Sequence, residues 1–123
     1  NKFCLNASLN QKIQVYKTAF NQYRPYLSLD DAFKAFKFFI NKNIFNNEIY
    51  NVLSGNYTVN QIIKMIKKYK TNIKIKFVKS KIMNQLSYQV ENKKLEKIGF
   101  KLRSSINKDI KETLSLLKNL NYK

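Results

Sequence analysis

Segments with strand-type periodicity alternate with segments of helix-type periodicity along this 123-residue chain, and this alternation limits the fold more than any single motif. Apolar residues at every second position predict strands, whereas apolar residues three and four positions apart predict amphipathic helices. Alternation of the two is typical of α/β layering. We therefore expect an α/β fold with mixed α+β layers. The expected strands are 12–16, 26–27, 48–53 and 73–78, and the expected helices are 3–9, 29–41, 58–70, 91–98 and 105–117.

Polar residues at the predicted helix ends indicate where several of the helices begin and stop. Ser28 is a candidate N-cap, and Asp31 three residues later completes a pair similar to a capping box. Thr58 and Gln61 form the same pair for the helix at 58–70. Gly99 is the expected stop of the helix before it. Helix 29–41 should place one apolar stripe in the core, formed by Ala32, Phe36, Phe39 and Ile40, with Lys34, Lys37 and Asn41 outward.

Length and composition predict one folded domain over residues 1–123 and exclude several kinds of site. Hydrophobic residues make up 44% of the chain, but no apolar run approaches the length of a membrane span. The single cysteine, Cys4, has no internal disulfide partner and is expected in the core, and there is no histidine. Histidine-based dyads and triads and the usual zinc sites are therefore excluded, and no metal ligand is predicted. The expected compartment is the reducing cytoplasm.

The formal net charge of +17 is open to two interpretations. A strongly basic chain is typical of proteins that bind nucleic acid or an anionic surface. However, of 24 basic residues only Arg24 and Arg103 are arginine, the residue that base recognition favours. The lysines accompany many Asn, Ile, Phe and Tyr residues, all encoded by A/T-rich codons, so codon bias explains the charge better. We do not expect nucleic acid as a partner.

The residues of this chain do not predict an active site. The two glycines, Gly55 and Gly99, lie too far apart for a P-loop or a glycine-rich dinucleotide loop. No tyrosine is followed four residues later by lysine, and no two carboxylates form an acid/base couple. We therefore predict no catalytic residue.

Arg24 is the main candidate for binding, because its planar guanidinium matches phosphate oxygens in a bidentate way. It is expected in a loop before a short strand, in the stretch 22–32. The alternative is a surface arginine whose stem packs on Tyr23 or Tyr26. Tyr16, at the end of a predicted strand, could pack on a nucleotide base or simply in the core. Lysines such as Lys81 could add positive charge beside Arg24 in a cleft.

Several segments resemble, in order and spacing, the C-terminal part of the extended short-chain dehydrogenase/reductases, the nucleotide-sugar epimerases and dehydratases. "QYRPYLSLDDA" resembles the family's arginine–strand–aspartate signature, and "EIYNVLSGNYTVNQI" its YNVGSG turn and following helix. The remaining segments are "IQVY" and "IKIKFV", similar to two strands, "ENKKLEKIGF", similar to a D-x-x-K-x-x-x-L-G-F element, and "SINKDIKETL", similar to the final helix.

The resemblance implies the substrate-binding portion of an NAD- or NADP-dependent nucleotide-sugar epimerase, dehydratase or reductase. An N-terminal Rossmann half of the same parent chain would carry the cofactor and the Tyr-x-x-x-Lys pair. The intact parent would allow a homodimer, whereas the isolated fragment would be inactive. Arg24 would bind the diphosphate of the nucleotide-diphosphate sugar and Tyr16 would lie near its base. "NQLSY", residues 84–88, resembles enzymes of surface-polysaccharide sugar biosynthesis.

Two positions depart from the family pattern. Lys81 stands where the family usually has an arginine near the phosphates, which keeps the charge but loses the bidentate geometry. Leu53 stands where a glycine usually allows close backbone approach. Two other interpretations remain: a stand-alone basic module that binds nucleic acid or an anionic surface, and a non-functional gene remnant. Exposed apolar faces would favour a fragment over an independent module.

Overall fold

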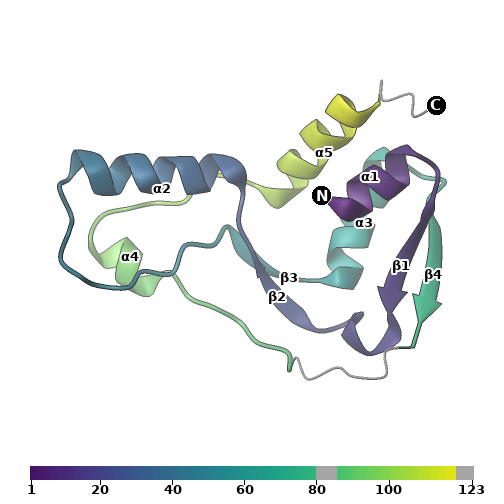
Figure 1. The fold of residues 1–123 in the computed structure, drawn as a ribbon, viewed down its shortest axis with the longest axis horizontal. Helices are drawn as coiled ribbons and strands as arrows, with labels where there is room; N and C mark the ends of the chain where they lie inside the picture. The colour runs from purple at the N-terminus through teal and green to yellow at the C-terminus, as the bar shows by residue number, and fades with distance from the viewer. Residues whose placement is uncertain (80–85, 119–123) are drawn as a thin grey trace.

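The computed structural model describes residues 1–79 and 86–118, and its mixture of short helices and strands confirms the predicted α/β fold. The element order is shown in Figure 1. The helices are α1 (Lys2–Ser8), α2 (Leu29–Asn41), α3 (Val59–Tyr69), α4 (Lys93–Lys97) and α5 (Ile106–Leu117), with one 3-10 turn at Lys17–Ala19. The strands are β1 (Lys12–Tyr16), β2 (Tyr23–Tyr26), β3 (Gly55–Thr58) and β4 (Lys74–Val78).

One core cluster lies between a parallel strand pair and three helices. β1 pairs with β4 in parallel register, from Lys12 opposite Lys74 to Tyr16 opposite Val78. Figure 1 shows α1, α3 and α5 gathered at the same end of the molecule as these strands. The alternation expected for β1 is confirmed, since its second and fourth residues are buried and the others exposed. The buried members of this cluster are Cys4, Ala7, Ile13, Val15, Ile62, Ile63, Ile66, Ile106 and Ile110.

The second strand pair corrects two of the expected elements. β2 and β3 pair antiparallel, from Tyr23 opposite Thr58 to Tyr26 opposite Gly55, so Arg24 lies within a strand and not in a loop before one. The predicted strand 48–53 is not a strand, and the pairing falls on residues 55–58, which follow it directly. Leu53 is buried, but its main-chain N–H and C=O bond to the Asn92 side chain, at 3.0 and 2.7 Å, instead of to a neighbouring strand.

A second, smaller core cluster joins α2 to the segment around α4, at the end of the molecule away from β1 and β4 (Figure 1). Ala35 of α2 is buried with Leu95 and Phe100, and Phe38 and Phe39 pack against them. The prediction that one stripe of α2, from Ala32 to Ile40, packs in the core is therefore wrong in part.

Phe36 is 71% exposed and Ile40 64% exposed, although both were expected in the core. The buried side of α2 carries Asp31 and Ala35. The helix is thus rotated relative to the prediction, because hydrogen bonds to the buried Asp31 turn that polar residue toward the inside.

The helix-end predictions were partly right. The capping box of Thr58 and Gln61 at the start of α3 is confirmed, with both reciprocal hydrogen bonds present. The stop at Gly99 is also confirmed, because Gly99 adopts φ +92° and the next residue, Phe100, packs back into the core. Ser28 precedes α2 as expected, but its hydroxyl makes no capping bond and the predicted pair with Asp31 does not form.

Candidate functional site

Arg24 lies at the junction of β2 and the segment that returns at residues 86–88. Its Nη1 donates to the carbonyl oxygens of Tyr23 and Leu86, at 2.6 and 3.0 Å, and its Nη2 donates to Gln22 Oε1 at 2.8 Å. The guanidinium carbon lies 5.3 Å from the centre of the Tyr88 ring. A cation above an aromatic face is attracted by the ring's negative potential, so Tyr88 helps to orient the guanidinium.

The same junction is fixed by a main-chain contact. Tyr23 N–H donates to Ser87 Oγ at 3.0 Å, which holds the returning segment against the start of β2. Sequence reasoning named Tyr23 or Tyr26 as packing partners in the alternative interpretation of Arg24, and it missed Tyr88 and Ser87. Both residues belong to the segment that resembles polysaccharide-sugar enzymes, which was the available signal.

The charge of Arg24 acts on its neighbour along the strand. Burial raises the pKa of the Tyr26 phenol, and the positive charge of Arg24 opposes part of that rise. The ring of Tyr26 meets that of Tyr57 on β3 edge to face, with centroids 6.1 Å apart. The site is therefore a half-buried cation among aromatic rings, an arrangement that suits an anion carrying a planar group.

Tyr16 is 51% exposed and lies at the rim of a different hollow, of about 490 Å³, between β1 and α1. Lys2, Lys12 and several amide side chains line that hollow, whereas Arg24 does not. The structure therefore places the two predicted binding residues in separate surroundings. The third, Lys81, lies outside the described residues.

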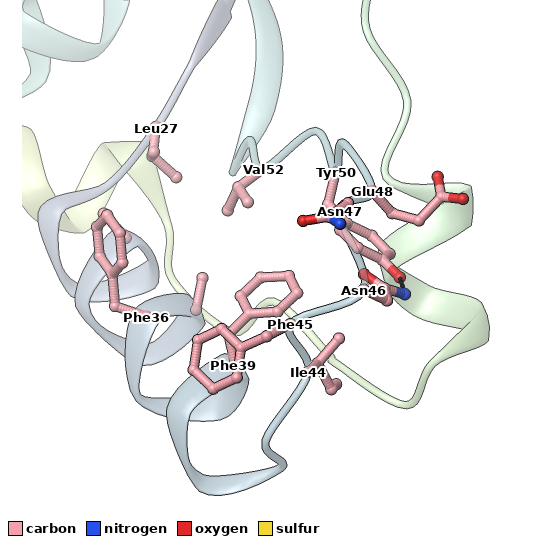
Figure 2. A pocket seen from close by; sticks show the side chains of 12 residues that line it. Leu27, Phe36, Phe39, Ile44, Phe45, Asn46, Asn47, Glu48, Tyr50 and Val52 are labelled. Carbon is pink, nitrogen blue, oxygen red and sulfur yellow. Dashed lines mark hydrogen bonds between the residues drawn. The ribbon is translucent and has the colours of Figure 1, made fainter.

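A second hollow, of about 570 Å³, lies between α2 and the loop that follows it. Figure 2 shows the rings of Phe36, Phe39 and Phe45 around it, with Leu27 and Val52 on the opposite side. Its polar rim carries Glu48, which pairs with Lys94 at 2.5 Å. Sequence reasoning missed this hollow because it assigned the apolar residues of α2 to a closed core.

Two kinds of feature are absent from the described part of the chain, a cluster of side chains that could hold a metal ion and a helix that could span a membrane. Among residues 1–79 and 86–118, no group of three or more Cys, Asp or Glu residues is placed to hold a metal ion. Within the same ranges, no helix has the length and apolar character needed to cross a membrane.

This chain is similar to known proteins in its structure. No protein-family model matches the sequence, and no curated protein matches it. Solved structures do match over nearly the whole chain.

Two dehydrogenases and two epimerases illustrate these matches. A consensus L-threonine 3-dehydrogenase superposes on 97% of this chain with a TM-score of 0.80 and 14% identity, over 41% of its own length. The holo L-threonine dehydrogenase of Cupriavidus necator covers 95% of this chain with a TM-score of 0.80 and 14% identity, over 40% of its own length.

The UDP-glucose 4-epimerase of Thermus thermophilus in complex with NAD covers 96% of this chain with a TM-score of 0.78 and 16% identity, over 39% of its own length. The UDP-N-acetylglucosamine 4-epimerase of Methanobrevibacter ruminantium in complex with UDP-N-acetylmuramic acid covers 92% with a TM-score of 0.74 and 20% identity, over 37% of its length. The chain thus has the fold of a part of these enzymes, about two fifths of their length.

Proposed function

We propose that this chain is the nucleotide-sugar-binding part of an NAD- or NADP-dependent sugar epimerase, dehydratase or reductase, an extended short-chain dehydrogenase/reductase. The observation that carries the proposal is its likeness in fold, over 92% of its length, to an epimerase solved in complex with a UDP-sugar. Several segments of the sequence resemble this enzyme family in their order and spacing, which supports the proposal independently of the fold. The residue similarity to surface-polysaccharide enzymes at 84–88 supports a role in making such sugars.

Arg24 is the residue that we assign to the diphosphate. Its guanidinium is oriented by Tyr88 and by two carbonyl oxygens, so a phosphate would meet a cation whose direction is already set. Tyr16 is assigned to the nucleotide base and Lys81 to the phosphates. Both assignments come from the resemblance, and Tyr16 would have to meet the ligand from a separate hollow.

We propose no dinucleotide site in this chain, because its two glycines lie in different elements. Gly55 lies in β3, where an added Cβ would meet the Tyr57 ring at 2.8 Å, and Gly99 follows α4, so the two do not form one loop. In the proposal, NAD or NADP is bound by a Rossmann half of the parent protein, which also supplies catalysis. Residues 1–123 then form one domain of a cytoplasmic enzyme that pairs as a homodimer and is inactive without that half.

A second candidate function is oxidation of a small hydroxy amino acid. Two L-threonine dehydrogenases match this chain with TM-scores of 0.80, above the 0.74 of the epimerase that carries the proposal. Such a substrate has no nucleotide diphosphate, so Arg24 would have no ligand phosphate to bind. The two candidates therefore differ in what loss of Arg24 should do.

The test is titration of the natural gene product with UDP-glucose and UDP-N-acetylglucosamine. Arg24→Ala should weaken binding by about 1.5–3 kcal/mol, the cost typical of a lost hydrogen bond to a charged group. Arg24→Lys keeps the charge without the planar fork and should recover part of the affinity. Arg103→Ala, which removes the other arginine, is the matched control and should leave affinity unchanged.

Unchanged affinity in Arg24→Ala would contradict the proposal, and turnover of L-threonine by that variant would favour the second candidate. Thermal unfolding of each variant separates a binding defect from a folding defect. A stand-alone basic module would instead bind DNA of any sequence, with an affinity that falls steeply with salt and ignores the sugar.

A further inference from the structure

The acidic residues of this chain are distributed unevenly. None of the seven lies in residues 1–29 or 49–90, so α1, β1, β2, β3, α3 and β4 carry no acidic side chain. Codon bias accounts for the number of lysines, but it does not explain why every carboxylate lies elsewhere, since the lysine-rich segments 93–97 and 106–118 do contain them. One part of the fold therefore carries only positive side-chain charge.

Exposed lysines of this part gather where α3 ends and both parallel strands begin. Lys12 is the first residue of β1, Lys74 is the first residue of β4, and the two are register partners. Lys67 and Lys68 lie in the last turn of α3, which leads into β4 through residues 70–73 (Figure 1). All four side chains are exposed, and none of them is in an ion pair within the described ranges. We call these four residues the lysine corner.

The lysine corner is unfavourable for the stability of the chain itself. Like charges directly opposite each other on neighbouring strands are destabilising, and Lys12 and Lys74 stand in this relation. Helix α5, which packs against α1 and α3, does carry carboxylates, but Glu112 already pairs with Lys108 at 3.6 Å. Local rules of this kind are typically broken at functional sites. An external anionic surface would relieve the repulsion between the lysines.

The chemistry of the lysine corner favours a lipid surface over a nucleic acid. All four cations are lysines, which act as point charges on flexible stems, whereas arginine is the residue that recognises phosphates and bases in a fixed geometry. The corner is formed by the ends of three elements, whereas single-stranded nucleic acid is typically bound along a groove. Tyr69, which is 39% exposed, follows Lys68 directly, and tyrosine is enriched at the headgroup level of membranes.

We propose that the lysine corner binds the surface of an anionic lipid bilayer and holds the protein there without inserting into it. Clusters of about four to eight basic residues are typical of such contacts with acidic phospholipids. The contact needs no nucleotide sugar, so it does not rest on the proposed function. Tyr16, the residue assigned to the base, lies at the opposite end of β1 from Lys12, about 13 Å away at about 3.3 Å per residue. A bilayer at the corner would therefore leave that end of the strand accessible.

Co-sedimentation of the natural gene product with lipid vesicles tests the proposal. One set of vesicles contains phosphatidylcholine alone, and the other contains about 30 mol% phosphatidylglycerol in phosphatidylcholine. Lys12→Gln combined with Lys74→Gln removes two charges from the corner. Lys37→Gln combined with Lys42→Gln is the matched control, because it removes two exposed charges from α2 and its C-cap, at the other end of the molecule (Figure 1).

We expect binding to the anionic vesicles only, with an affinity that falls as sodium chloride is raised. The corner variant should bind at least about tenfold more weakly than the wild type, and the control variant at most about twofold more weakly. An equal loss in the two variants would overturn the proposal, because net charge and not the corner would then explain the binding. Equal binding to neutral vesicles, or no binding to anionic ones, would also overturn it.

Three further measurements separate the alternatives. Thermal melts show whether each variant is folded, so that weaker vesicle binding is not mistaken for unfolding. A DNA duplex that binds the corner more tightly than the anionic vesicles do at the same salt concentration would assign the corner to nucleic acid and overturn the proposal. Arg24→Ala should bind vesicles no more weakly than the control variant, so loss of nucleotide-sugar binding alone contradicts only the proposed function.

Discussion

Asp31 shows how one buried carboxylate organises this fold. Its side chain is fully buried, and its oxygens accept hydrogen bonds from Ser54 Oγ at 2.7 Å and from the main-chain N–H groups of Arg103 and Ser104, at 3.3 and 3.2 Å. Burial alone would raise the pKa of this carboxyl, but the hydrogen bonds together outweigh burial and lower it. Asp31 therefore joins α2 to the segment before β3 and to the segment before α5.

The lowered pKa predicts a pH dependence of stability. A carboxylate whose pKa is lower in the folded state stabilises the fold above its ordinary value of 3.8 and loses that contribution as the pH falls through the folded value. The melting temperature should therefore fall between about pH 5 and pH 2. Asp31→Asn should destabilise the protein at neutral pH by about 1–3 kcal/mol, because the partly buried N–H groups of Arg103 and Ser104 lose a charged acceptor.

Thermal melts of the wild type and two variants across this pH range measure the effect. Asp31→Asn should show a smaller acid-induced fall than the wild type. Asp30→Asn is the comparison with an exposed carboxylate: hydrogen bonds to Lys34 and Ser104 lower the pKa of Asp30 as well, but solvent screens them, so this variant should change the acid-induced fall less than Asp31→Asn does. Equal pH profiles for Asp31→Asn and the wild type would contradict the role given to this carboxylate.

At the scale of elements, two asparagines replace a missing strand pairing. Asn92 Nδ2 donates to Leu53 O and its Oδ1 accepts from Leu53 N–H. In the same way Asn56 Nδ2 donates to Val90 O, at 2.9 Å, and its Oδ1 accepts from Val90 N–H, at 3.0 Å. Each amide satisfies one residue's main chain as a neighbouring strand would, so the segments 53–56 and 90–92 are held together without a ladder.

Replacing one of these asparagines should therefore lower the free energy of unfolding by more than the size of its side chain suggests. Asn92→Ala should lower the free energy of unfolding by about 1–3 kcal/mol, since it leaves the main chain of the buried Leu53 without partners. Asn92→Asp keeps the acceptor for Leu53 N–H but cannot donate to its carbonyl, so it should also destabilise. Urea unfolding measures both, with the exposed Asn51→Ala as control. A loss no larger than that of Asn51→Ala would contradict this explanation.

The local sequence predicted some helices and strands better than others. β1, α3 and the stop at Gly99 depend on local signals, namely alternation, a capping box and a glycine with positive φ, and all three were predicted correctly. β3 and the orientation of α2 depend on partners distant in sequence. The asparagine amides and the buried Asp31 decide both, and no local pattern contains that information.

At the scale of the whole molecule, the net charge of +17 opposes compaction. The parallel strands β1 and β4 add a local repulsion between like charges, because Lys12 and Lys74 are register partners on neighbouring strands and both are exposed. Repulsion between exposed charges is screened by salt, over a Debye length of about 10 Å at 0.1 M.

Salt should therefore stabilise this protein. We expect the melting temperature to rise as sodium chloride increases from about 20 to 300 mM, since screening weakens the self-repulsion. Lys74→Gln should melt higher than the wild type at low salt and respond less to added salt. Lys118→Gln, at the end of α5, removes one charge elsewhere and serves as the control. A melting temperature that does not change with salt, or falls, would contradict the prediction.

For the candidate site, the sequence singled out Arg24 but not the residues that surround it. Arg24 was identified from its chemistry and from the family signature, and its contact with Tyr88, far along the chain, was not foreseen. The assignments of Arg24, Tyr16 and Lys81 to a ligand all remain predictions. The single domain over 1–123 also remains a prediction, although two core clusters are present.

The sequence by itself determined the fold class, most helices, two of the strands and the exclusion of histidine chemistry, because periodicity, capping and composition act over short distances. Only the tertiary structure decided which side of α2 is buried, where the antiparallel pair forms and which ring lies under Arg24. These features depend on hydrogen bonds and packing between residues tens of positions apart, such as Asp31 with Ser104, and those contacts exist only in the folded chain.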